Sequence, residues 1–230
     1  MKKHIYNITP FTLLDFPGKV ACIVWFSGCG MRCGYCYNTE IVTGEAHYDY
    51  KDVLAFLDTR RGLLQGVVLC GGEALFSFDY AMFAFIQEIR KMGFLLKLDT
   101  NGINYQALEK LITAKLLDFV ALDFKAPKNK FELVTQNKSH FYDFFLRSLE
   151  ILIKSEIAFE IRTTLHQDLL TLEDIQEIVL VLDSLHYKGV YYLQNFIDGK
   201  KNFQNLSKKY NGFDPRKINK YSLDIEYRNF

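Results

Sequence analysis

Residues 19–36 read Lys-Val-Ala-Cys-Ile-Val-Trp-Phe-Ser-Gly-Cys-Gly-Met-Arg-Cys-Gly-Tyr-Cys, and the fold can be worked out from there. The first eight of them are a β-branched and aromatic run, which is typical of a strand buried in a parallel sheet. Three cysteines follow within eight residues, at Cys29, Cys33 and Cys36. The stretch therefore predicts a buried strand that ends in a cysteine-rich loop.

The cysteine spacings of four and three residues would also place all three sulfurs on one face of a helix. Glycines at positions 28, 30 and 34 argue against a helix. Each glycine disfavours a helix interior by about 1 kcal/mol relative to alanine, and glycine lets the backbone approach a ligand closely. We predict a wrapped loop, in which Tyr35 covers one side of the bound group.

Three thiolates are one too few for a closed tetrahedral zinc site, which would need a distant fourth ligand from Cys22, Cys70 or His47. A cubane iron-sulfur cluster differs, because three thiolates leave one of its four irons open to a ligand that is not protein. Cysteine 70 has a simpler interpretation as a small core residue, since buried free cysteine behaves as a small hydrophobe. The triad favours an iron-sulfur cluster that binds substrate.

Apolar runs and helical patterns alternate along the rest of the chain. The predicted strands are residues 19–26, 66–70, 94–100, 118–124, 158–165 and 189–196. The predicted helices are residues 50–58, 79–92, 104–116, 140–155 and 171–184. Six strands that alternate with five helices indicate an α/β fold of parallel strands, either an open sheet or part of a barrel.

Polar residues and glycines lie just past the carboxyl end of one predicted strand after another, or in the last part of the strand itself. They are Cys29, Cys33 and Cys36; Gly71, Gly72 and Glu73; Asp99, Thr100, Asn101 and Gly102; Asp123 and Lys125; Arg162 and Thr164; and Gln194 and Asn195. The carboxyl ends of parallel strands carry the active sites of α/β folds. We expect these residues to converge on one site.

The cysteine spacing, with an aromatic residue before the third cysteine, resembles the radical S-adenosylmethionine (SAM) superfamily. That resemblance implies a partial (β/α)6 TIM-like barrel and a [4Fe-4S] cluster held by Cys29, Cys33 and Cys36. It also implies that SAM chelates the open iron through its amino and carboxylate groups. Gly71-Gly72-Glu73 resembles the GGE motif beside the SAM amino group, although Ala74 stands where the family usually has proline. The alternative is a simple turn with an exposed glutamate.

Two later segments, Leu98-Asp-Thr-Asn-Gly102 and Ala121-Leu-Asp-Phe-Lys125, resemble the glycyl-radical-enzyme activating branch of this superfamily. The resemblance implies that Asp99 and Asp123 help to hold SAM and a monovalent cation, that Lys125 meets the SAM carboxylate, and that Thr100 is a further ligand of the cation. The alternative is that these residues form a turn or a salt bridge at a strand end. Two further residues are expected to bind SAM. They are Arg162, which needs an anionic partner in an apolar strand, and Gln194, which can bind ribose.

The N-terminal segment Thr9-Pro-Phe-Thr-Leu-Leu-Asp-Phe-Pro-Gly-Lys19 resembles activating proteins of anaerobic ribonucleoside-triphosphate reductase. This implies an enzyme that abstracts hydrogen from a glycine of that reductase, with flavodoxin or ferredoxin as electron donor. No second group of cysteines is present, so one cluster is expected. The alternatives are a radical SAM enzyme acting on a small molecule, as 7-carboxy-7-deazaguanine synthase does, and a non-enzymatic metal-binding module.

Composition narrows the class of protein. A net charge of +1 offers no general attraction for nucleic acid, and no signal peptide or apolar run long enough to cross a membrane is visible. Five cysteines with three bunched together do not resemble a secreted disulfide framework, so we expect a cytoplasmic, reducing location. The five histidines are scattered without ligand spacing and receive no role.

The charge is uneven along the chain: residues 200–230 carry eight Lys/Arg and three Asp/Glu, which makes them +5 and the remainder −4. We predict a radical SAM domain over residues 1–199 and a basic C-terminal extension over 200–230. The extension is expected to be a solvated tail rather than a docking surface for a partner. Its aromatic residues Phe203, Tyr210, Phe213 and Tyr221 suggest that it packs back on the domain.

Overall fold

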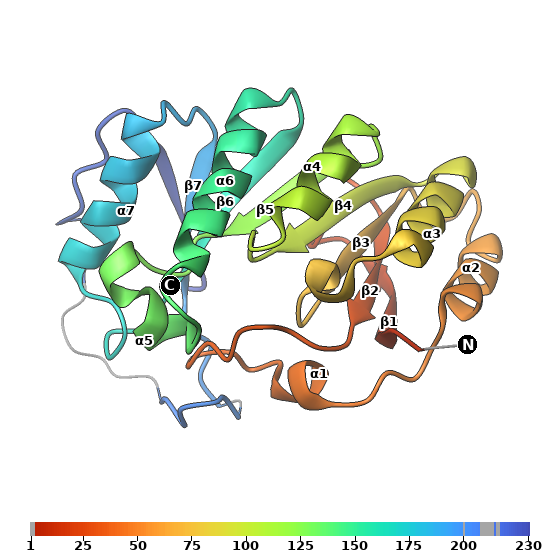
Figure 1. Cartoon of the computed structure of the whole chain (residues 1–230), viewed down its shortest axis with the longest axis horizontal. Coiled ribbons are helices and arrows are strands. Elements are labelled where there is room, and N and C mark those ends of the chain that lie inside the picture. Colours follow the sequence, from red (N-terminus) through yellow and green to blue (C-terminus); the bar gives the residue numbers. More distant parts are fainter. Residues whose placement is uncertain (1–2, 200, 208–213, 215–216) are drawn as a thin grey trace. The chain divides into compact units, whose positions relative to one another are not determined.

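The computed structural model describes residues 3–199, 201–207, 214 and 217–230 (Figure 1). Its strands are β1 (Ile5–Thr12), β2 (Ala21–Phe26), β3 (Gly66–Gly71), β4 (Leu95–Thr100), β5 (Phe119–Asp123), β6 (Ala158–Leu165), β7 (Val190–Asn195) and β8 (Asp224–Arg228). Its α-helices are α1 (Thr39–Thr43), α2 (Tyr50–Asp58), α3 (Tyr80–Lys91), α4 (Tyr105–Thr113), α5 (Phe131–Thr135), α6 (Phe141–Lys154) and α7 (Leu172–Ser184). Two short 3-10 helices, η1 (Ala74–Ser77) and η2 (Lys128–Lys130), complete the described elements.

The sheet follows the order of the chain, from β1 to β8. Strand β1 runs antiparallel to β2, whereas the pairs β2–β3, β3–β4, β6–β7 and β7–β8 are parallel. Strands β1 and β8 stand at opposite ends of this order, so among the described residues the sheet is open rather than closed into a full barrel. All six predicted strands and all five predicted helices are present, so the predicted alternation is confirmed. The outer strands β1 and β8 and the short helices were not predicted.

The chain forms two compact units. The first unit consists of Met1–Gly30, Glu40–Thr100 and Asn104–Ala121, and it holds β1 to β4 and the start of β5. The second unit consists of Met31–Thr39, Asn101–Ile103 and Leu122–Phe230, and it holds the end of β5 and β6 to β8.

The core of the first unit lies on β2 and β3, as their apolar composition predicts. Residues Phe16, Ala21, Ile23 and Val68 form a buried cluster, and Cys70 packs against it, as expected, while remaining only partly buried. Asp49 caps the start of helix α2, and its carboxylate accepts hydrogen bonds from the backbone N–H groups of Lys51 and Asp52. Such capping satisfies backbone N–H groups that have no partner inside the helix.

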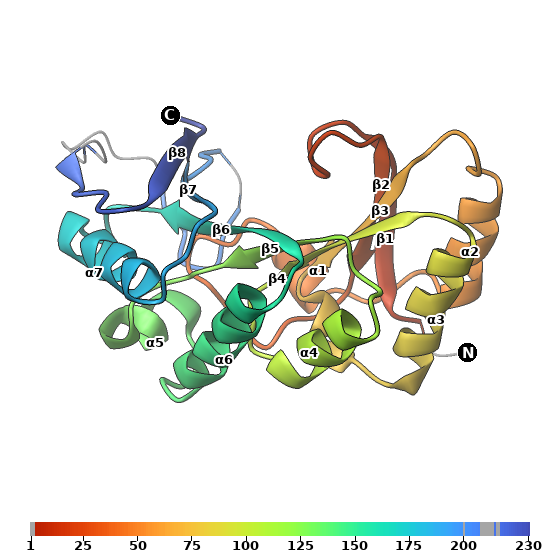
Figure 2. The same ribbon diagram turned by 90° about the horizontal axis from the view of Figure 1, so that it is seen from above.

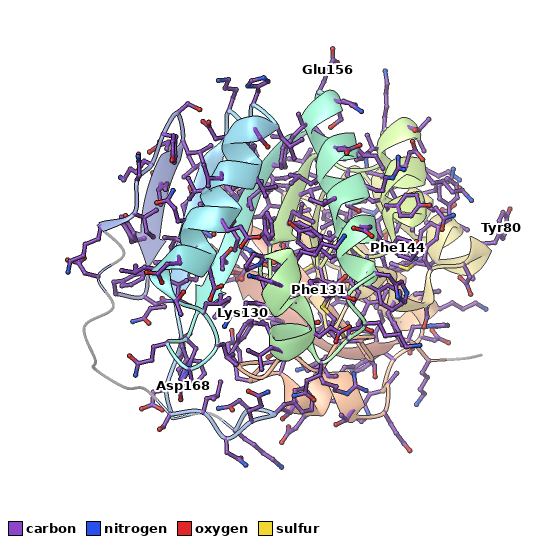
Figure 3. The ribbon with its side chains drawn as sticks, turned by 60° about the vertical axis from the view of Figure 1, so that its left-hand side comes forward. Tyr80, Lys130, Phe131, Phe144, Glu156 and Asp168 are labelled. Atoms are coloured by element: carbon purple, nitrogen blue, oxygen red, sulfur yellow. The ribbon has the colours of Figure 1, made fainter. Side chains whose placement is uncertain are left out.

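The core of the second unit lies between its strands and the helices that follow them. Figure 2 shows α6 and α7 on one side of β6, β7 and β8. Phe131, which Figure 3 labels, lies at the start of α5. Its ring packs on that of Tyr142 of α6, with the ring centroids 5.9 Å apart. Helix α7 begins with a capping box, in which Thr171 and Asp174 each bind the other's backbone N–H.

The C-terminal segment adds β8 to the sheet, in parallel register with β7. Ile218, Leu223 and Ile225 are buried, whereas Tyr221 is 52% exposed. Among the described residues of this segment, aliphatic side chains fill the interior, whereas Tyr221, which was expected to help it pack, is largely exposed. Phe203 is half-buried and lies 5.8 Å from the guanidinium of Arg32. Tyr210 and Phe213 lie outside the described residues.

Candidate functional site

Two loops of the first unit interlock where β2 and β3 end. The N–H of Gly72 donates to the Phe26 carbonyl at 3.0 Å, and the N–H of Glu73 donates to the Gly28 carbonyl at 2.9 Å. A Cβ on Gly72 would overlap the Gly28 carbonyl, so only glycine allows this approach. Cys29 follows directly and is buried. The predicted GGE segment thus fixes the backbone at the start of the cysteine loop.

Glu73 lies inside the first unit, and the alternative of an exposed turn residue is wrong. Its carboxylate accepts a hydrogen bond from the Thr100 hydroxyl at 2.8 Å. It also accepts one from the Leu75 N–H at 3.1 Å, which caps η1. A buried carboxylate needs such donors, because burial without them is costly. The sequence predicts a functional role for both Glu73 and Thr100, and the structure joins their side chains.

Asp99 has a partner that the sequence analysis missed. The ammonium of Lys97 forms an ion pair with Asp99, and the side chains are only 3% and 13% exposed. The two residues are two positions apart on β4 and therefore face the same side of the sheet. A lysine in the middle of the apolar run Leu95-Leu-Lys-Leu98 was the signal that could have revealed this pair.

Cys33 and Cys36 lie in a loop of the second unit, and residues 29–36 contain no helix, as predicted. The N–H of Cys36 donates to the Cys33 carbonyl at 2.9 Å and closes a tight turn. The neighbouring backbone groups of Arg32 and Gly34 donate to the carbonyls of Thr135 and Val134, at 2.9 and 3.0 Å. Helix α5 therefore holds this half of the cysteine loop in place.

Tyr35 points a polar atom into the interior of the second unit. Its hydroxyl is buried and has no hydrogen-bond partner among the described residues. Its ring lies 5.8 Å from the ammonium of Lys125. Burial raises the pKa of Tyr35 well above its ordinary value, so the phenol stays neutral. An unsatisfied buried hydroxyl is costly, which marks this spot as one where a polar ligand would fit.

Asp123, Lys125 and Arg162 form one charged group in the second unit. Asp123 accepts from the Lys125 ammonium at 3.0 Å and from Nε of Arg162 at 2.9 Å. Burial acts to raise the pKa of Asp123, but the two cations outweigh burial and lower it to about 2. The pKa of Lys125 lies well above its ordinary value, because Asp123 outweighs the opposing effect of burial. Charges of both signs suit a zwitterionic ligand such as an amino acid.

Gln194 occupies a place on β7 beside these residues. In the parallel register Arg162 lies opposite Tyr192, and Thr164 lies opposite Gln194. Gln194 is therefore one step further along the same face of the sheet as Arg162. Its predicted contact with SAM stays a prediction.

The sequence analysis also missed Glu160 and Arg228 of the second unit. Arg228 holds both oxygens of Glu160, at 3.1 and 2.9 Å, and its guanidinium carbon lies 3.4 Å from the centre of the Tyr192 ring. Glu160 was detectable, because it precedes Arg162 by two residues and shares its face of β6. Arg228 was not, since it is 68 residues away in the chain.

None of the five cysteines, all of which the structure describes, forms a disulfide, so Cys29, Cys33 and Cys36 remain chemically able to bind iron. In the described part of the chain, no three His, Cys, Asp or Glu side chains are grouped as they would be around a single metal ion. A four-iron cluster takes its thiolates on different irons and does not require such a group. Burial raises the pKa of Cys36, so binding of iron must displace its proton. The donor set therefore fits the predicted cluster.

Comparisons with known proteins agree with this description. The family model of the Radical SAM superfamily matches residues 23–182. A putative glycyl-radical enzyme activating enzyme of Methanocaldococcus jannaschii is 27% identical over 199 residues, which are 85% of this chain and 81% of that protein. A pyruvate formate-lyase-activating enzyme of Clostridium pasteurianum is 27% identical over 157 residues, 64% of this chain and 63% of that protein.

Solved structures with a similar fold include Streptococcus suis SuiB bound to S-adenosylmethionine. That match has a TM-score of 0.67 and 16% identity, and it covers 90% of this chain and 52% of SuiB. Another is anSMEcpe with bound AdoMet, with a TM-score of 0.60, 18% identity, and coverage of 77% of this chain and 52% of the other. This chain thus spans about half the length of these structures. They confirm the predicted fold class.

The family model covers most of the chain, so the predicted superfamily is confirmed, and its predicted branch is the one to which the curated relatives belong. The cofactors of the family are a [4Fe-4S] cluster and SAM, which confirms these two predictions. The residues that bind them stay predictions. No helix among the described residues is long and apolar enough to cross a membrane. The chain belongs to the radical SAM superfamily and is an enzyme of that type.

Proposed function

We propose that this enzyme abstracts a hydrogen atom from a glycine of a partner protein and leaves a glycyl radical there. The observation that carries the proposal is the charged group of the second unit, where the ammonium of Lys125 pairs with Asp123 and lies over the ring of Tyr35, 5.8 Å from its centre. Tyr35 lies between Cys33 and Cys36 in sequence. A binding group for an amino acid therefore adjoins the loop that carries two proposed cluster ligands. Similarity to glycyl-radical activating enzymes over most of the chain supports the same activity.

In this proposal Cys29, Cys33 and Cys36 bind the cluster and leave one iron to SAM. When bound and reduced, the cluster would supply the electron for reductive cleavage of SAM at its S–C5′ bond. Lys125 and Arg162 bind the carboxylate of SAM, and Asp123 keeps both cations in place. The aromatic ring of Tyr35 covers the ligand on one side.

The backbone of the Gly71-Gly72-Glu73 segment is proposed to lie beside the SAM amino group. Gln194 is proposed to bind the ribose. The predicted monovalent cation at Asp99 and Thr100 stays a prediction, and Lys97 already supplies a positive charge to Asp99.

Hydrogen would pass from the α-carbon of the target glycine to the 5′-deoxyadenosyl group, so that the products would be 5′-deoxyadenosine, methionine and a glycyl radical on the partner. The electron comes from outside, and flavodoxin or ferredoxin is the proposed donor, since one cluster is expected per chain. The thiols and the reduced cluster need a reducing compartment, for which we propose the cytoplasm.

The proposed partner is anaerobic ribonucleoside-triphosphate reductase, because residues 9–19 resemble the activating proteins of that enzyme. A second candidate partner is pyruvate formate-lyase, since relatives such as the Clostridium pasteurianum protein are named as its activating enzymes.

The test is to incubate the anaerobically purified, cluster-loaded enzyme with SAM, dithionite and each candidate partner. A glycyl-radical doublet in the EPR spectrum of the reductase, with one 5′-deoxyadenosine formed per radical, is the expected result. A doublet on pyruvate formate-lyase alone would reassign the partner. Turnover of a small substrate, with no radical on either protein, would contradict the proposal.

Two cysteine variants provide a matched control for the cluster ligands. Cys33→Ala is expected to abolish SAM cleavage, because one of three ligands is lost. Cys22→Ala is expected to keep the cluster, because Cys22 is fully buried on β2 and burial raises the pKa of its thiol to about 12. Equal loss of iron in the two variants would show that the wrong thiols were chosen.

A further inference from the structure

The charged group of the second unit extends as far as the C-terminal strand. Five side chains alternate in sign, and we call them the charge ladder: Lys125, Asp123, Arg162, Glu160 and Arg228. Successive members are joined by ion pairs of 3.0, 2.9, 3.8 and 2.9 Å. The ladder connects the proposed SAM site with the basic segment 200–230, to which the proposed function gives no role.

The strands of the second unit explain why the ladder forms. Glu160 and Arg162 are alternate residues of β6 and share a face of the sheet. The neighbouring strand presents Tyr192 opposite Arg162, and β8 presents Arg228 opposite Gln194. The guanidinium of Arg228 lies over the ring of Tyr192, with its carbon 3.4 Å from the ring centre. Stacking on an aromatic face fixes the plane of the guanidinium and attracts its charge.

Glu160 is the member of the ladder that decides how Arg162 is placed. Its side chain is only 7% exposed, and a buried carboxylate is strongly destabilising unless cations and hydrogen bonds satisfy it. Arg228 satisfies both oxygens, with Nη1 at 3.1 Å from Oε1 and Nη2 at 2.9 Å from Oε2. Arg162 approaches the same Oε1 only at 3.8 Å.

Arg162 instead directs its Nε to Asp123 at 2.9 Å. If Arg228 were removed, the buried carboxylate of Glu160 would stay charged but would lose the guanidinium that binds both of its oxygens. The guanidinium of Arg162 is the next cation along the ladder, so Glu160 would draw it away from Asp123. Lys125 would then be the one member of the ladder still paired with Asp123.

We propose that Arg228 is a positioning residue for SAM binding, because its pairing with Glu160 keeps Arg162 on Asp123. This inference rests on the proposed function, since it takes Arg162 as a ligand of the SAM carboxylate. It gives β8 a role that a solvated tail would not have.

The test measures the affinity for SAM by anaerobic equilibrium dialysis of the cluster-loaded enzyme with radiolabelled SAM. R228Q is expected to raise the Kd about tenfold, which is typical of a change in a network that does not touch the ligand. The double variant R228Q/E160Q is expected to return the Kd to within about threefold of the wild type, because the neutral amide no longer competes for Arg162. Iron content and thermal unfolding of each variant are measured alongside.

Rescue by the second substitution separates positioning from a purely structural role. If Arg228 only attached β8 to β7, removal of Glu160 would not restore SAM binding, and equal Kd values for R228Q and R228Q/E160Q would overturn the inference. R90Q is the matched control, because Arg90 forms a half-buried pair with Asp118 in the first unit, and it is expected to leave the Kd unchanged.

R162Q distinguishes failure of this inference from failure of the site assignment. Weaker SAM binding in R162Q together with wild-type binding in R228Q would overturn the role of Arg228 and leave Arg162 as a SAM ligand. Wild-type binding in both variants would overturn the two assignments together. The assay contains no partner protein, so it does not depend on which glycyl-radical enzyme is the target.

Discussion

At the scale of single residues, the site depends on charges that are buried in pairs. Lys97 is buried and Asp99 is largely buried, and Glu160 is buried against Arg228, which is itself partly exposed. Burial of an ion is costly unless a partner of opposite charge is close, so each member of a pair depends on the other. Exposed pairs such as Lys91 with Glu88 contribute far less, because water screens them.

Lys97→Met is expected to lower the free energy of unfolding by about 3 kcal/mol, because it leaves the carboxylate of Asp99 buried without its cation. The double variant K97M/D99N is expected to recover most of that loss, since it removes the charge as well. Denaturant unfolding checks both, with Lys91→Met as the control that breaks an exposed pair and has almost no effect. Equal stability of K97M and wild type would contradict this account of Asp99.

A second prediction at this scale concerns pH. The pKa of Asp123 is lowered from 3.8 to about 2, because Arg162 and Lys125 outweigh burial. A lowered pKa stabilises the folded state above the unfolded value, and the contribution is lost as the pH falls through the folded value. Asp123 is therefore expected to contribute about 2 kcal/mol at pH 7, of which about half has gone at pH 3.

The measurement compares denaturant unfolding of wild type and Asp123→Asn from pH 7 to pH 3. The difference in stability between them is expected to shrink only below pH 4. A difference that shrinks already between pH 7 and pH 5 would contradict the lowered pKa.

At the scale of elements, the loops after β2 and β3 are joined through their backbones. The hydrogen bonds from Gly72 and Glu73 to the β2 loop leave no room for a side chain at position 72. Gly30 differs, since a Cβ there would only meet the ring of Phe76 at 3.4 Å, an ordinary contact distance. The backbone packing therefore requires glycine at position 72 but not at position 30.

Gly72→Ala is expected to destabilise the protein by about 1–3 kcal/mol and to reduce the iron bound after reconstitution, because the added methyl group must displace the Gly28 carbonyl. Gly30→Ala is the matched control and is expected to bind iron as the wild type does. Iron analysis and thermal unfolding check both. If the two variants lost iron equally, the close approach of the backbones would not be the reason for Gly72.

At the scale of the whole molecule, the chain forms two units, and the sequence offers one group of clustered cysteines. Two further cysteines, Cys22 and Cys70, are placed in β2 and β3 of the first unit and pack there. The predicted boundary at residue 199 stays a prediction, although β8 in the basic segment pairs with β7.

The purified enzyme is accordingly expected to hold about four iron and four sulfide per chain after anaerobic reconstitution, as one [4Fe-4S] cluster requires. Iron and sulfide analysis together with the EPR spectrum of the reduced protein checks this. About eight iron per chain, or a second EPR signal, would show that a further cluster binds.

The sequence alone determined the local features of this protein. The apolar runs and helical patterns predicted β2 to β7 and five helices, because burial against the sheet imposes a period on each element. Glycines 28, 30 and 34 predicted the loop, and the number of clustered cysteines predicted the type of cofactor, since Cys29, Cys33 and Cys36 are one thiolate short of a closed tetrahedral site.

Only the tertiary structure decided which charges pair. Glu160 and Arg228 are 68 residues apart, and nothing in the sequence near either residue names the other. Strand β8 pairs with β7 in the sheet, and this pairing places Arg228 within hydrogen-bonding distance of Glu160. Pairing energies depend on distance and burial in space, so separation along the chain carries no information about them.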